Sequence, residues 1–292
     1  MGDAMANVDL IASYWTIAGK LNFANGMDVE GSPIDFPQRV QAATQGGFVG
    51  VGLTYPDLKK TAARHGYDGI RSILRDNGVK FFELEFLTDW FTDGDRRRQS
   101  DAIRRELLHA AEKTGARHIK IGGDMEGKSW PMDRVIQSFA ELCDEANNAG
   151  TNIVLEILPW SNIPNIKTGV ELVSSADRSN GTLLVDIWHM GRGGIPYHEV
   201  AAMPGRFLGY VELSDAAPKP IGKLIEDTMN HRRLCGEGSF DVPAFLRAIQ
   251  ATGYDGPFGI EIISDEQRNR SLKQAIERSF VTAMAQFAGI YP

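Results

Sequence analysis

The sequence predicts an α/β protein built as a single closed (β/α)8 barrel, and three observations lead to that fold class. Short apolar segments of strand length alternate along the chain with longer amphipathic segments of helix length. Eight such strand-like segments fit within the 292 residues. No linker, low-complexity tract or block of charge divides the chain, so one domain spanning residues 1–292 is expected.

The expected strands are the apolar segments. Several of them, such as "NIVLEIL", "GTLLVDI" and "FLGYVEL", are nearly continuous apolar runs, which suit strands buried on both faces of a parallel sheet. The eight ranges are Leu10–Trp15, Phe48–Leu53, Val79–Phe86, His118–Ile121, Asn152–Leu158, Thr182–Trp188, Phe207–Leu213 and Pro257–Ile262.

The expected helices lie between these strands. Glycines in "RDNGVK" and "NNAGTN" stand where a helix ends before a strand begins. A doubly wound open sheet is the alternative fold, but the segment "TIAGKLNFANG" after the first strand lacks its GxGxxG spacing. The helical ranges are Phe36–Gln45, Leu58–Asn77, Arg96–Thr114, Met132–Ala149, Val242–Thr252 and a closing helix at about Glu266–Phe287.

Composition excludes several classes of protein. The net charge of −7 and the absence of a basic patch argue against nucleic-acid binding. No apolar run is long enough to span a membrane, and the N-terminal "MGDAMANVD" lacks the basic residues of a secretory signal. A cytoplasmic protein is therefore expected, with Cys143 and Cys235 as free thiols because their spacing is not that of a metal site.

Carboxylates stand at the ends of four consecutive expected strands. In a parallel barrel these ends face a common mouth, where the active site lies. Buried acids that converge would repel one another, and burial of each charge is costly unless it is paired or bound to a metal. The nearest bases, Lys120 and the pair Arg232 and Arg233, cannot easily neutralise four acids. A divalent cation with oxygen ligands is the better explanation, and a structural salt bridge for Glu212 or Glu261 is the alternative. The four acids are Glu156, Asp186, Glu212 and Glu261.

His189 follows Asp186 by three residues, so it is expected on the loop after the sixth strand, at the barrel mouth. An imidazole there can contact substrate or move a proton. His118 lies inside an expected strand, and a structural role is favoured for it. Glu83 and Glu85 lie near another strand end, and one of them facing the pocket is the less favoured interpretation.

Four segments carry a resemblance to a known family: "VLEILPWSNIP", "LLVDIWHMGRGG", "YVELSDA" and "RRLCGEGSFDVPAFLRAIQATGYDGPFGIEI". Over roughly positions 8–265 the sequence resembles the sugar phosphate isomerase/epimerase family with the xylose isomerase-like TIM barrel. The resemblance implies one divalent metal ion, a substrate-facing His189 and an Arg232 that contacts substrate oxygens. The implied carboxylate ligands of the metal are Glu156, Asp186 and Glu261.

Glu212 departs from the family pattern, because the fourth ligand there is usually His, or Gln in some branches. The extra carboxylate makes the first shell one charge more negative. Three outcomes are open for it. Glu212 binds the metal, or takes up a proton because like charges surround it, or turns toward Arg232, Arg233 or Lys120.

The chemistry that these residues suit is proton abstraction next to a carbonyl of a sugar, keto-sugar or polyol. The metal, Mn²⁺ first and Mg²⁺, Co²⁺ or Zn²⁺ as alternatives, polarises the substrate and stabilises an enediolate. The resemblance implies that one of Glu156 and Glu261 takes the proton and the other returns it. Lys120, Arg232 and Arg233 are expected to hold substrate oxygens. Trp160 and Trp15 are expected either to wall the pocket or to pack in the core, and both alternatives are open.

Three functions compete. The first is a metal-dependent isomerase or epimerase, and the second is a lyase on the same scaffold, either an inosose or dehydroshikimate dehydratase or a 3-keto-glycoside eliminase. The third is a catalytically silent barrel subunit, for which the departure at Glu212 is the support. A homo-oligomer is compatible with the resemblance.

Overall fold

Eight parallel strands form a closed barrel in the part of the chain that the computed structural model describes, which is residues 8–21, 23–24, 27–28 and 30–291. The first strand pairs with both the second and the last strand of the barrel, so the sheet has no edge. The closed barrel expected from the sequence is confirmed. In order around the barrel the strands are β1 (Leu10–Ala12), β10 (Phe258–Ile260), β9 (Leu208–Leu213), β8 (Gly181–Asp186), β7 (Asn152–Glu156), β6 (His118–Ile121), β5 (Phe81–Leu87) and β4 (Gly50–Thr54).

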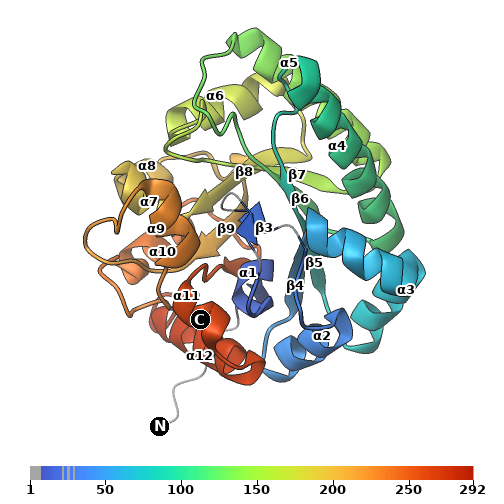
Figure 1. Cartoon of the computed structure of the whole chain (residues 1–292). Coiled ribbons are helices and arrows are strands. Elements are labelled where there is room, and N and C mark those ends of the chain that lie inside the picture. Colours follow the sequence, from blue (N-terminus) through green and yellow to red (C-terminus); the bar gives the residue numbers. More distant parts are fainter. Residues whose placement is uncertain (1–7, 22, 25–26, 29, 292) are drawn as a thin grey trace.

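Helices surround the barrel (Figure 1). The longer ones are α2 (Phe36–Gln45), α3 (Tyr55–Asp76), α4 (Gly94–Thr114), α5 (Met132–Asn148), α6 (Ile166–Ala176), α10 (Val242–Ala251) and α12 (Leu272–Gln286). The shorter ones are α1 (Tyr14–Ile17), α7 (Ile187–Gly193), α8 (Tyr197–Ala201), η1 (Gly205–Phe207), α9 (Leu224–Asn230) and α11 (Asp265–Asn269). A small antiparallel hairpin, β2 (Phe23–Ala24) with β3 (Met27–Asp28), lies outside the barrel sheet. Helix α12 packs against α1 and α2, so the two ends of the described chain meet in the helical layer (Figure 1).

Four expected strands, the first, fifth, sixth and eighth, end two or three residues earlier than the apolar pattern suggested. The first stops at Ala12, and Trp15 belongs to the short helix α1. The sixth stops at Asp186 rather than Trp188. There the Asp186 carboxylate accepts a hydrogen bond from the Trp188 backbone N–H at 2.8 Å and thereby caps α7. An apolar run that continues from a buried strand into a buried helix has no break in hydrophobicity to mark the boundary.

The expected closing helix is divided into α11 and α12. Arg270 has extended backbone angles between the two helices. Ser271 then begins α12 through a capping box, because its side chain accepts from the Gln274 backbone N–H while the Gln274 side chain accepts from the Ser271 N–H. The Ser271 cap explains why one amphipathic segment forms two helices.

The inside of the barrel changes from apolar to charged along its axis. Ile11, Val154, Leu184 and Tyr210 pack together inside the barrel with Phe81 beside them. Further along the same strands, toward their carboxyl ends, the inward side chains become acids and bases. The main apolar core lies between the strands and the helices. Polar and charged side chains can therefore occupy the barrel interior near the carboxyl ends of the strands.

Other expectations concern the whole chain. No helix among the described residues is long and apolar enough to cross a membrane. Cys143 and Cys235 are both buried and free, as expected. Most of the N-terminal segment used to argue against a secretory signal, residues 1–7, lies outside the described residues.

Candidate metal centre

Four strands bring their terminal carboxylates to one point at the barrel mouth. Glu156 is the last residue of β7, Asp186 the last of β8, and Glu212 pairs with Asp186 in the register of β8 and β9. Glu261 directly follows β10. One oxygen from each carboxylate lies within 4.8 Å of those of the other three, and all four residues are buried. The structure therefore brings together the four acids that the strand ends singled out.

The donors of this cluster fit a divalent cation. All four are carboxylate oxygens, the ligands that hard and borderline divalent ions take. Glu212 Oε2 is buried and, within the described structure, has no hydrogen-bond partner. An unpartnered buried carboxylate oxygen is costly, and a cation at the centre of the four residues would satisfy it.

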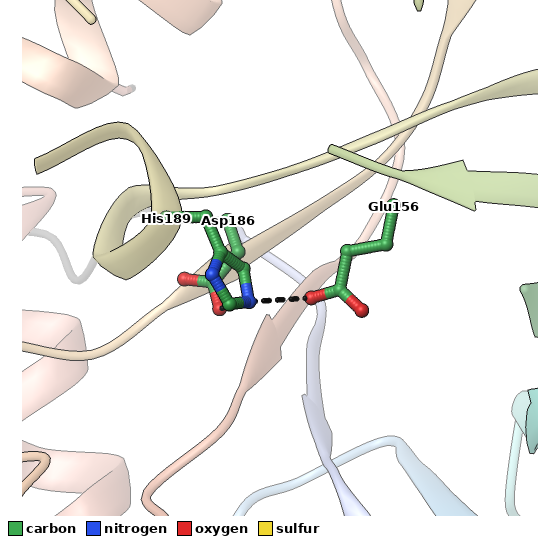
Figure 2. Close-up of side chains that lie close together, drawn as sticks. All are labelled: Glu156, Asp186 and His189. Atoms are coloured by element: carbon green, nitrogen blue, oxygen red, sulfur yellow. Dashed lines mark ion pairs between the residues drawn. The ribbon is translucent and has the colours of Figure 1, made fainter. Parts of the chain in front are cut away.

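His189 completes a second group with Glu156 and Asp186. Figure 2 shows the imidazole of His189 directed at the Glu156 carboxylate, and its Nε2 lies 2.9 Å from Glu156 Oε1 and 3.6 Å from Asp186 Oδ2. The expectation of a loop position was wrong, because His189 lies in the first turn of α7. Helix α7 begins at the Asp186 cap. Asp186 therefore supplies one carboxylate of the cluster and also sets the start of the helix that carries the His189 imidazole.

Arg232 connects two of the clustered acids. Its Nη1 donates to Asp186 Oδ2 at 2.6 Å and lies 3.0 Å from Glu261 Oε2. Its Nη2 donates to Thr228 Oγ1 at 3.0 Å, and its guanidinium lies over the Trp188 ring, 5.2 Å from the ring centroid. The side chain is buried and held from several sides, so it can present a fixed positive charge beside the cluster.

Lys120 lies deeper in the barrel than the sequence suggested. Its side chain is 1% exposed, and its Nζ donates to Glu212 Oε1. The same ammonium is 3.1 Å from Glu83 Oε1 and 3.5 Å from Glu261 Oε1. Burial by itself lowers the pKa of Lys120, but the surrounding carboxylates, Glu212 first, outweigh burial and hold it well above its usual range. Lys120 is therefore a permanently charged ammonium enclosed by acids.

A pocket-facing acid on β5 was the less favoured interpretation, yet Glu83 and Glu85 both face the barrel interior. Glu85 Oε2 is 3.5 Å from the Lys120 ammonium, and Glu83 Oε2 is 3.2 Å from His118 Nε2. The signal was present in "FFELEFL", because acids two residues apart in a strand share one face. His118 is buried beside them, in agreement with the structural role favoured for it.

The pKa values of the two acids of β5 are shifted in opposite directions. Burial raises the pKa of Glu83, but Lys120 and His118 outweigh it and hold the pKa at about 2. Burial, with the charges of Glu261, Glu83 and Glu156, raises the pKa of Glu85 to about 8 despite Lys120. Burial and like charges raise the pKa of Glu212 and of Glu261 in the same way. Without a cation, burial and like charges therefore favour the protonated forms of Glu85, Glu212 and Glu261, but not of Glu83.

The remaining expected site residues lie at different distances from the cluster. Trp160 packs edge-on against the His189 ring, with ring centroids 5.2 Å apart. Trp15 packs edge-on against Tyr14 in α1. Arg233 is exposed, donates to the Glu237 carbonyl at 3.3 Å and lines a cavity of about 220 Å³ with Glu237, Glu266 and Arg270. The structure thus gathers Trp160 and Arg232 around the cluster and leaves Arg233 on the surface.

The barrel and its carboxylate cluster define a class of protein. The sequence profile of the xylose isomerase-like TIM barrel family matches residues 40–282. The chain belongs to this family.

Particular relatives within this class carry out different reactions. The chain is 26% identical over 242 residues to a 3-dehydroshikimate dehydratase of Pseudomonas aeruginosa, which covers 78% of this chain and 36% of that protein. It is 24% identical over 240 residues to an inosose isomerase of Bacillus velezensis, covering 80% of this chain and 84% of that protein. The chain thus spans a little more than a third of the dehydratase that it matches. The solved IOLI protein with a bound zinc atom has the same fold, with a TM-score of 0.80 at 16% identity over 95% of this chain and 97% of that one.

Proposed function

We propose that this chain is a divalent-metal-dependent isomerase or epimerase that acts on a sugar, keto-sugar or polyol by removing a proton next to a carbonyl. The observation that carries the proposal is the meeting of four buried carboxylates at the barrel mouth, with His189 against one of them. The relation to an inosose isomerase supports the same class of reaction.

Glu156, Asp186 and Glu261 would hold the cation, with Glu212 in the fourth position. When bound, a divalent cation polarises the substrate carbonyl and the hydroxyl beside it. Mn²⁺ is the first candidate because every donor is an oxygen, and Zn²⁺ is an alternative because the IOLI protein binds zinc.

The proton would move through Glu156 and Glu261. These carboxylates come from β7 and from the end of β10, which are not neighbours in the barrel, so a substrate between them meets an acid on either side. The His189 imidazole, 2.9 Å from Glu156 Oε1, orients that carboxylate. Arg232 fixes Glu261 from the other side through the 3.0 Å contact.

A lyase is the second candidate function, and His189 is the observation that favours it. The imidazole is buried at the mouth beside Glu156, where it can give a proton to a departing hydroxyl or alkoxyl oxygen. The relation to 3-dehydroshikimate dehydratases supports this reading. Both reactions begin with the same proton abstraction.

The substrate would bind against an aromatic wall. Trp160 stands next to His189 and offers a ring face to a sugar. Arg232 is the cation best placed for substrate oxygens, whereas Lys120 is enclosed by acids and Arg233 lies on the surface. An unphosphorylated substrate is proposed, because the cluster is predominantly acidic.

Incubation of the Mn²⁺-loaded protein with keto-inositols, keto-hexoses and keto-glycosides in D₂O tests the proposal. An isomerase or epimerase incorporates deuterium into a product that keeps the composition of the substrate, whereas a lyase gives an unsaturated product. E156Q should lower the rate by ~100-fold or more, because a ligand and proton carrier is lost. The matched control is E171Q, since Glu171 is exposed on α6. If the wild type binds no divalent ion and E156Q behaves like E171Q, the chain is a catalytically silent barrel instead.

A further inference from the structure

The carboxylate cluster contains a resident cation, Lys120, whose closest partner is Glu212. Lys120 reaches up from β6, and Glu212 faces it across the barrel from β9. The ammonium takes Glu212 Oε1 and leaves Glu212 Oε2 without a hydrogen bond. Glu212 is therefore shared between a fixed ammonium and the cation position.

The other acids of the cluster have different partners. Asp186 Oδ2 accepts from Arg232, and Glu156 Oε1 faces His189 Nε2. Glu261 Oε2 is 3.0 Å from Arg232 Nη1. Its other oxygen, Oε1, makes a longer contact of 3.5 Å with Lys120 Nζ. The Lys120 ammonium thus has its strongest contact with Glu212, whose side chain is completely buried on the inner wall of β9.

Charge and burial explain why the pair stays together. A buried ammonium has lost its hydration, and removing one partner of a buried ion pair leaves the other uncompensated. Glu83, 3.1 Å away, holds the ammonium from the side away from the mouth. Gly52 makes room for Glu83, because a Cβ at that position would lie 2.8 Å from Glu83 Oε1. Glu83 and the space left by Gly52 therefore hold the Lys120 ammonium in place below the four carboxylates.

We propose that Lys120 is a positioning residue that holds Glu212 as its counterion, so that the Lys120–Glu212 pair acts toward the metal as a neutral ligand. This inference rests on the proposed metal-dependent function. Glu156, Asp186 and Glu261 then carry most of the metal affinity. The ammonium offsets the fourth negative charge and keeps the bound cation a stronger Lewis acid than four free carboxylates would allow.

Mn²⁺ binding, measured by calorimetry and by electron paramagnetic resonance at one mildly alkaline pH, tests the proposal without any substrate. E212Q should weaken Mn²⁺ binding by no more than ~10-fold, because it removes no principal ligand and only leaves the Lys120 ammonium uncompensated near the cation, whereas E156Q should weaken binding by ~100-fold. K120Q should tighten binding by ~10-fold, because the ammonium no longer repels the cation and Glu212 is released. The control K167Q removes an exposed lysine of α6 and should leave the dissociation constant unchanged.

The double variant K120Q/E212Q gives the decisive comparison. It should bind Mn²⁺ ~10-fold more weakly than K120Q, because Glu212 becomes a true ligand only when Lys120 is gone. The proposal is overturned if E212Q alone is as damaging as E156Q, if K120Q weakens binding or leaves it unchanged, or if E212Q costs nothing in the K120Q background. Should K120Q fail to fold, K120Q/E83Q removes a carboxylate together with the ammonium and replaces it in each comparison. Equal Mn²⁺ binding by wild type and E156Q would instead refute the proposed metal centre itself.

Discussion

Arg232 and Arg233 are adjacent in sequence and have opposite surroundings. The Arg232 guanidinium is buried and contacts Asp186, Glu261 and Thr228. Arg233 is exposed and contacts a backbone carbonyl. The alternation follows from an extended segment in which Arg233 forms a bridge with Asp215, so successive side chains point to opposite sides.

This contrast predicts different results for the same conservative change. R232K should lower kcat/KM by ~100-fold, because a lysine ammonium cannot serve two carboxylates and a threonine hydroxyl in the fixed geometry of a guanidinium. The measurement is steady-state kinetics with the substrate found in the D₂O assay. R233K is the control and should remain within ~2-fold of the wild type. Similar losses in both variants would show that Arg233 also contacts the substrate.

The four strand-end acids could be predicted from the sequence, but their partners could not. Acids that close apolar strands of a parallel barrel must face one mouth, so Glu156, Asp186, Glu212 and Glu261 followed from position alone. That Lys120 meets Glu212 depends on the stagger of strands across the barrel, which hydrophobic patterns do not encode. The same limit made a pocket-facing Glu83 or Glu85 the less favoured interpretation, because their partner Lys120 becomes evident only when the strands are placed.

At the scale of elements, the side chains of β4 and β5 on the inner wall of the barrel are complementary in size. Gly52 of β4 pairs with Glu83 of β5, and its missing side chain leaves the space that Glu83 occupies. A Cβ there would also lie 3.2 Å from the Tyr14 backbone nitrogen. A small residue on one strand thus permits a buried acid on the next.

G52A should therefore destabilise the protein by about 1–3 kcal/mol, because the added methyl group overpacks a rigid wall. The free energy of unfolding can be measured by urea denaturation of the metal-free chain. G69A provides a comparison on α3, where the new Cβ would meet only a side-chain carbon of His65 at 3.2 Å. It should be neutral or slightly stabilising. Equal stability of G52A and wild type would mean that Glu83 moves away freely.

The element boundaries that sequence patterns missed lie mainly around the mouth. Helices α6 to α9 were not expected, and all but α6 are only five to seven residues long. Helices this short show too few turns for a periodicity to be recognised. The long helices α2, α4 and α5 were expected within about two residues of their observed ends.

At the scale of the whole molecule, the barrel encloses more acids than fixed bases. Glu83, Glu85 and the four clustered carboxylates face Lys120 and Arg232 as the permanent cations of the described interior. Such an excess is tolerable only with bound protons or with a bound metal. The stability of the fold is therefore coupled to pH and to metal.

Glu85 gives the direction of that coupling. Its pKa rises from 4.5 to about 8 on folding, so the folded chain holds this proton more tightly than the unfolded chain. Its contribution to stability is complete below the unfolded value of 4.5 and is lost as the pH rises toward about 8. In EDTA the melting temperature of the wild type should fall between pH ~5 and ~8 more steeply than that of E85Q.

Calorimetric scans across this pH range check the expectation. Mn²⁺ should restore most of the stability lost by the wild type at the alkaline end, because a divalent ion replaces the protons. An identical pH slope in E85Q and wild type would mean that Glu85 is already ionised in the folded chain.

The pairing of β1 with β10 has a consequence for how the protein is made. Leu10 of the first strand is the register partner of Phe258 in the last, and Glu261 directly follows that last strand. During synthesis the ribosome therefore releases three of the four clustered acids long before the fourth. A nascent chain can form its early βα units one after another, but the cation position is completed only when the final strand has emerged and closed the ring.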